Sequence, residues 1–131
     1  MSNFNKMETA KVIELLQERP GMFLPRVDFF NACSFLNGAS HLVMTNFLIG
    51  FSDWLSFKAA KDHKAYWWPQ QILASARQKK NCDGEELEEL ALLTLFEELK
   101  LFLEEKAAIG LNAIVSRFEE QRGWNRREPG R

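Results

Sequence analysis

Hydrophobic positions in the second half of the chain recur at helical spacing over a long stretch. At 100° per residue, seven apolar residues after Asp83-Gly84 fall within an arc of about 140°. They are Ala91, Leu92, Leu95, Phe96, Leu99, Phe102 and Leu103. Asp83 and Glu86 match an Asp-started capping box, and Gly110 interrupts the pattern. The spacing predicts a helix of about six turns that ends near residues 107–108 and faces the core with this arc.

The N-terminal part of the chain shows the same period in shorter runs. Val12, Ile13, Leu15 and Leu16 predict a helix over Glu8–Glu18, and Arg19-Pro20-Gly21 ends it. The following Met22–Pro25 segment is apolar and lies between two prolines. It is predicted to be an extended, buried loop.

Two more helices are predicted before residue 58. Asp28 is a plausible N-cap for a short helix that stops at Asn37-Gly38, and Ser40 caps a longer one that runs to about Phe57. The longer helix would face the core with Met44, Phe47, Leu48, Phe51, Trp54 and Leu55.

The remaining helices are predicted from Trp68 to Arg77, with Pro69 in the first turn, and from Asn112 onward. Residues 123–131 are predicted to be a frayed tail, with Trp124 as a possible anchor, and residues 1–122 a single domain. No run alternates with period two. The pattern predicts an all-α fold, a compact bundle of five or six helices.

Composition narrows the class of protein. The chain has 131 residues, 46% hydrophobic, and a net charge of −1, which argues against a disordered chain and against a uniformly basic nucleic-acid binder. No apolar run approaches the roughly 18 residues of a membrane span. The N-terminus has no apolar signal core, and two cysteines fit a reducing compartment. A cytoplasmic protein is expected.

The residues that usually carry catalysis are sparse. The histidines are His41 and His63, and a zinc site would require both to converge with Cys33 and Cys82 without any metal-binding spacing. Cys33 lies among phenylalanines, where a thiol is expected to pack as a small hydrophobe with a raised pKa. The sequence therefore predicts a protein that is not an enzyme and that uses no cofactor or metal.

Charge is distributed in blocks. Residues 58–82 carry six basic residues and one Asp, whereas residues 83–106 carry nine acidic residues and two Lys. One interpretation is a solvated acidic helix face that pairs with lysines of the basic block. The basic block also contains Tyr66, Trp67 and Trp68, which suits single-stranded RNA, although core tryptophans beside solvated lysines are the favoured explanation.

The order of several short segments resembles a family of small bacterial immunity proteins that accompany polymorphic toxins, including those of contact-dependent growth inhibition. The resemblance covers roughly residues 8–105 and departs from the related pattern at Pro25. It implies a cytoplasmic antitoxin that binds a cognate toxin domain one-to-one, and many such toxins are nucleases. The segments are Arg19-Pro20-Gly21-Met22-Phe23-Leu24, Phe35-Leu36-Asn37-Gly38, Gly50-Phe51-Ser52-Asp53-Trp54-Leu55, Trp67-Trp68, Ile72-Leu73 and Leu95-Phe96-Glu97-Glu98-Leu99.

An acidic surface fits that role, because a nuclease presents a basic groove to phosphates. Glu86, Glu97 and Glu104 fall within about 20° of each other on the predicted helix, and we call them the acidic ridge. Glu89 lies beside the ridge. Leu90, Leu101 or Trp124 would supply an apolar anchor. The ridge, Glu89, Leu90 and Leu101 form the predicted toxin-binding surface.

The alternative is a helical regulatory or adaptor module that binds a host protein. In one version the chain forms a homodimer through Leu87, Leu90 and Leu101. An RNA-binding role for residues 58–80 is a third, minor alternative.

Overall fold

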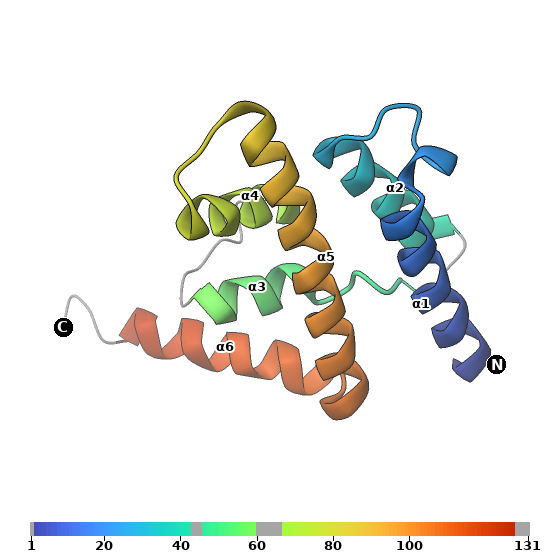
Figure 1. Cartoon of the computed structure of the whole chain (residues 1–131). Coiled ribbons are helices and arrows are strands. Elements are labelled where there is room, and N and C mark those ends of the chain that lie inside the picture. Colours follow the sequence, from blue (N-terminus) through green and yellow to red (C-terminus); the bar gives the residue numbers. More distant parts are fainter. Residues whose placement is uncertain (1, 43–45, 60–66, 128–131) are drawn as a thin grey trace.

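The computed structural model describes residues 2–42, 46–59 and 67–127, which form six α-helices and one 3-10 turn and contain no strand (Figure 1). Side chains are described for residues 9–41, 46–59 and 67–120. The all-α bundle predicted from the sequence is confirmed. The elements are α1 (Ser2–Glu18), η1 (Pro20–Met22), α2 (Phe29–Leu42), α3 (Phe51–Ala59), α4 (Trp68–Lys79), α5 (Gly84–Ile109) and α6 (Leu111–Arg127).

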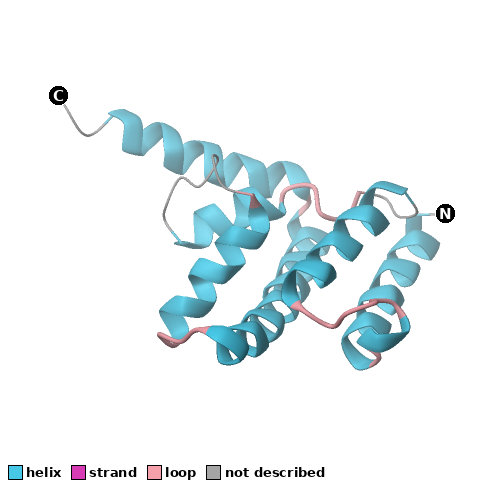
Figure 2. Cartoon of the chain, turned by 90° about the horizontal axis from the view of Figure 1, so that it is seen from above, coloured by secondary structure: helices cyan, strands magenta, loops and turns pink. Residues whose placement is uncertain are grey.

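The longest helix, α5, is the centre of the arrangement. It contacts α2 on one side and α3, α4 and α6 on the other, and α3 also packs against α4 and α6 (Figure 1). In both views α1 and the far end of α6 lie on opposite sides of the molecule (Figure 2). A helix between two groups of neighbours needs an apolar surface over much of its circumference. The leucine-rich sequence of α5 meets that need.

The core between α3, α4 and α5 is aromatic. Phe51 is fully buried, and its ring centroid lies 5.1 Å from that of Phe102 and 5.4 Å from that of Trp68. Leu95, Leu99 and Phe102 are also fully buried, so the apolar arc predicted for α5 does face the core. Each large aromatic side chain buries about 150–250 Å², so these rings contribute strongly to the core.

The predicted helix from Ser40 to Phe57 is wrong, as is the predicted stop at Asn37-Gly38. Helix α2 continues past Gly38 to Leu42, and a turn over residues 46–50 separates it from α3. Ser40 helps to end α2, because its hydroxyl accepts a hydrogen bond from the Leu48 amide (3.2 Å) and its carbonyl accepts one from the Asn46 amide (3.1 Å).

The turn itself depends on left-handed backbone at its two ends. Asn46 has φ of 56° and Gly50 has φ of 93°, and neither value is compatible with a continuous helix. Phe47, Phe51, Trp54 and Leu55 are nevertheless buried as predicted, and Leu48 packs against the core. Met44 lies outside the described residues.

The prediction of a buried loop over Met22–Pro25 is wrong as well. Amides of Phe23 and Leu24 both donate to the Pro20 carbonyl (3.0 and 2.9 Å) and curl the chain into η1. Met22 is 68% exposed as a result, while Leu24 is buried. The predicted N-cap at Asp28 is confirmed, because its Oδ1 accepts the Asn31 amide at 2.8 Å.

Several helix ends differ from the prediction. Helix α1 begins at Ser2 rather than Glu8, α4 extends to Lys79, and α6 continues to Arg127, past residue 122. Asp83 stands at the N-cap of α5 in extended conformation but makes no capping hydrogen bond with its side chain. The capping box is therefore not formed. Residues 128–131 and the side chain of Trp124 lie outside what is described.

Candidate protein-binding surface on α5

Helix α5 carries eight glutamates and two lysines, and many of these carboxylates take part in the fold. Glu88 accepts the Phe29 amide at the start of α2 (2.8 Å). Glu98 is buried and accepts two hydrogen bonds from Lys58 of α3 (2.7 and 3.0 Å). Glu105 accepts from the Trp54 indole (3.2 Å) and from Arg117 of α6. These three glutamates tie α5 to its neighbours.

Two of the three residues of the acidic ridge are paired with the end of α4. Glu97 forms an ion pair with Lys79 (3.0 Å), whose ammonium also donates to Thr94, and Glu86 pairs with Lys80. Hydrogen bonding to Glu86 and its negative charge raise the pKa of Lys80. The interpretation of the acidic block as a solvated face paired with lysines of residues 58–82 is thus confirmed for Glu86 and Glu97. Glu98 also pairs with a lysine of that stretch, but its side chain is buried and not solvated.

The other exposed carboxylates of α5 are Glu85, Glu89 and the ridge residue Glu104. None of the three has an ion-pair partner among the described residues. Exposed carboxylates without an ion pair therefore lie in two places: Glu85 and Glu89 near the start of the helix, and Glu104 about four turns further on.

The exposure of the leucines on α5 differs from the prediction. Leu101 is 48% exposed, as an apolar anchor requires, but Leu90 is half-buried against the core and Leu87 is buried. The homodimer face of Leu87, Leu90 and Leu101 is therefore not available as a whole. Leu93 is 52% exposed and was missed by the sequence analysis. Its helical position, within about 40° of both Glu86 and Glu97, was the signal that could have identified it.

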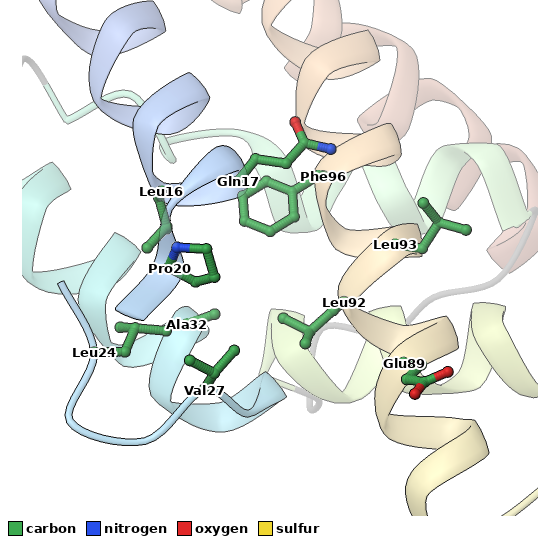
Figure 3. Close-up of a pocket in the computed structure, with 10 residues that line it drawn as sticks. All are labelled: Leu16, Gln17, Pro20, Leu24, Val27, Ala32, Glu89, Leu92, Leu93 and Phe96. Carbon is green, nitrogen blue, oxygen red and sulfur yellow. The ribbon is translucent and has the colours of Figure 1, made fainter. Parts of the chain in front are cut away.

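A shallow groove of about 260 Å³ borders this surface (Figure 3). Leu16, Gln17 and Pro20 come from the end of α1 and from η1, Val27 and Ala32 come from the loop and the start of α2, and Leu24 lies between them. Figure 3 shows Leu92 and Phe96 pointing from α5 toward this wall, whereas Glu89 and Leu93 lie on the outer side of α5. The groove is largely apolar, and Glu89 is its one carboxylate.

Within the described part of the basic stretch, residues 58–59 and 67–82, most of the basic side chains are paired. Lys58, Lys79 and Lys80 are engaged with glutamates. Trp68 is buried, with its indole donating to Asn37 (3.0 Å), and Trp67 is half-exposed. Lys61, Lys64, Tyr66 and His63 lie outside the described residues.

Within the described residues, no three His, Cys, Asp or Glu side chains are grouped so that they could hold a metal ion. The same part of the chain has no helix that is both long and apolar enough to cross a bilayer. Comparisons with protein-family models, with curated proteins and with solved structures found no match to this chain.

Both cysteines are buried and neither forms a disulfide. Burial raises the pKa of the Cys33 thiol strongly, and the negative charges of Glu88 and Asp28 raise it further, because all three disfavour the thiolate. The prediction of a core thiol with a raised pKa is confirmed, and a thiol in that state is a poor nucleophile.

This burial predicts slow alkylation and a loss of stability at alkaline pH. In a Cys82→Ala background, iodoacetamide at pH 8 should modify Cys33 at least about a hundredfold more slowly in the folded protein than in urea. In the unfolded chain the Cys33 thiol ionises near pH 8.5, whereas in the folded chain it stays protonated to higher pH. The contribution of this thiol to the free energy of unfolding is therefore complete below about pH 8.5 and is lost progressively as the pH rises above it. Urea unfolding at pH 7 and pH 10 measures this loss, and Cys33→Ala should reduce it. Equal alkylation rates in the two states would contradict the burial.

Proposed function

We propose that the chain is an immunity protein that binds a toxin domain one-to-one and blocks the basic active-site cleft of that toxin, which we take to be a nuclease. The observation that carries the proposal is the outer face of α5, where exposed carboxylates that form no ion pair within the described residues lie near the half-exposed Leu93 and Leu101. The resemblance of the ordered segments to immunity proteins adds the biological class. The cytoplasm, where a toxin would meet its substrate, is the proposed location.

The charge that would act on the partner is concentrated at the beginning of α5. Residues 83–89 contain five carboxylates, of which Glu86 is neutralised by Lys80. Such a local excess attracts a cationic surface from a distance and accelerates association, and salt weakens the effect. Carboxylates placed against lysines and arginines of a nuclease cleft would occupy the positions that substrate phosphates need.

The exposed leucines of α5 offer apolar area that a partner can bury. Exposed ion pairs contribute little net free energy, whereas a few apolar side chains that become buried carry most of the affinity of an interface. Leu93 and Leu101 lie on the outer face of α5 among the glutamates, and both have area left to bury. A surface of this composition fits a protein partner better than it fits a nucleic acid.

The test is co-expression with a toxin candidate. The C-terminal domain encoded by the reading frame directly upstream is expressed in a bacterial host with and without this chain. The intact chain should restore growth and co-purify as a one-to-one complex. Association should slow by about tenfold or more between low and high salt. Toxicity that persists beside the folded chain, with no complex, would overturn the proposal.

A matched pair of variants tests the surface. Replacing Glu85, Glu89 and Glu104 by Gln should slow association, because it removes the uncompensated charges of α5. Replacing Glu14, Glu18 and Glu120 removes the same number of exposed carboxylates from α1 and α6 and should leave the rate nearly unchanged. Equal effects of the two sets would show that net charge alone matters.

The adaptor alternative would use the same exposed leucines with a host protein or a second copy. Light scattering of the purified chain separates the dimer version, since a monomeric mass at high protein concentration removes it.

A further inference from the structure

The groove between α5 and the α1–η1–α2 segment combines an apolar wall with a charged edge. Leu92 and Phe96 form the α5 side of the wall, and Leu16, Pro20 and Leu24 form the opposite side. At the mouth, Val27 and Leu93 are 49% and 52% exposed. Leu93 lies on α5 and Val27 lies in the loop just before α2.

The charge of the edge is negative. Glu85 lies one turn before Glu89, and at 100° per residue both fall within about 60° of Leu92 and Phe96 around α5. Glu89 lies at the outer edge of that arc. Neither carboxylate has an ion-pair partner among the described residues. Arg26, the residue next to Val27, forms an ion pair with Asp28 (3.6 Å). The groove is therefore left with uncompensated negative charge beside an apolar surface.

The size of the groove selects the kind of occupant. A volume of about 260 Å³, open along one side, is below the roughly 300–1,000 Å³ typical of sites that enclose a whole small molecule. It is large enough for an apolar side chain and the backbone that bears it. The wall offers one carboxylate and one amide side chain for hydrogen bonding, Glu89 and Gln17, which is few for the orientation of a polar metabolite.

We propose that this groove receives a polypeptide segment that packs one branched aliphatic or aromatic side chain over Leu92, flanked by Val27 and Leu93, and places a lysine or arginine against Glu89. The inference rests on the proposed function, in which the segment belongs to the basic surface of the toxin. It assigns the main apolar anchor of the interface to the groove. Leu101, two turns further along α5, lies outside it.

Peptide selection tests the groove without a toxin. The full-length chain is immobilised and panned against a phage-displayed library of random 16-residue peptides, and enriched peptides are synthesised. We expect them to pair an apolar residue with a Lys or Arg three or four positions away, which matches one helical turn. Val27→Ser/Leu93→Ser should weaken their binding by at least about tenfold, and Glu89→Gln by severalfold.

The controls remove the same chemical groups elsewhere. Ile109→Ser deletes an exposed apolar side chain of α5 about 24 Å along the helix from Leu93, and Glu120→Gln deletes an exposed carboxylate of α6. Both should leave peptide affinity unchanged. The inference would be overturned if no peptide were enriched, or if the selected peptides bound the Val27→Ser/Leu93→Ser variant as tightly as the wild type. If only Glu89→Gln left the affinity unchanged, the proposed contact between a lysine or arginine and Glu89 would be wrong.

The growth assay then separates the two proposals. If the wild-type chain protects and Val27→Ser/Leu93→Ser protects equally well at limiting expression, the groove assignment fails while the immunity function stands. If the wild-type chain does not protect although selected peptides bind at the groove, the immunity function fails and the groove remains a peptide-binding site.

Discussion

Phe102→Ala should lower the free energy of unfolding by about 3–5 kcal/mol, the largest loss that we expect from any single substitution. Phe102 is fully buried in α5, and its ring centroid lies 5.1 Å from that of Phe51 and 5.8 Å from that of Trp54. Truncation would open a cavity where α3 meets α5, because the surrounding rings belong to a helix that is fixed on its other sides by α4 and α6. Urea unfolding followed by tryptophan fluorescence measures the change.

The neighbouring residue supplies the control. Leu101→Ala removes an apolar side chain from the same turn of α5, but that side chain is 48% exposed and leaves no cavity. Its cost should stay below about 1 kcal/mol. Similar losses at the two positions would mean that α5 does not present Phe102 to the core.

Much of the fold is predictable from local pattern. The burial of Leu95 and Leu99 follows from helical period alone, and the cap at Asp28 follows from the chemistry of one side chain. Both depend on residues within a few positions of each other in the sequence. The helical period predicts the wrong structure at the turn over residues 46–50. The apolar spacing continues through these residues, but Asn46 and Gly50 have positive φ angles, which interrupt the helix.

The candidate site was harder to predict because it depends on distant residues. Lys79 and Lys80 reach Glu97 and Glu86 only because α4 and α5 fold back on each other. A helical projection of α5 cannot show which carboxylates such a neighbour neutralises. Leu90 and Leu93 are equivalent in the sequence pattern, and only the packing of the other helices makes Leu93 the more exposed. The groove joins segments some 70 residues apart, so no local pattern contains it.

The second large effect concerns the ion pair that joins α3 to α5. Glu98 is only 8% exposed, and its carboxylate is held by Lys58, whose ammonium also lies 4.7 Å from the centroid of the Trp54 ring. The Lys58 side chain is about half-exposed. The two partners therefore differ in what happens when the other is removed: the lysine can turn into water, whereas the carboxylate stays enclosed.

This asymmetry predicts unequal costs. Lys58→Met keeps most of the apolar stem but leaves the Glu98 carboxylate buried without a cation, which should cost about 2–4 kcal/mol of unfolding free energy. Glu98→Gln leaves a neutral amide beside a lysine that can hydrate, and should cost less than about 1.5 kcal/mol. Urea unfolding of each variant under the same conditions measures both losses.

The double variant decides the cause. If the Lys58→Met loss arises from the stranded charge, then adding Glu98→Gln removes that charge and should recover at least about 1 kcal/mol, so that the double variant is more stable than Lys58→Met alone. If the loss arises instead from missing contacts between Lys58 and Trp54, the second substitution recovers nothing and the two costs add. Neither Lys58 nor Glu98 lines the groove. The same three variants should therefore keep their affinity for selected peptides wherever they remain folded.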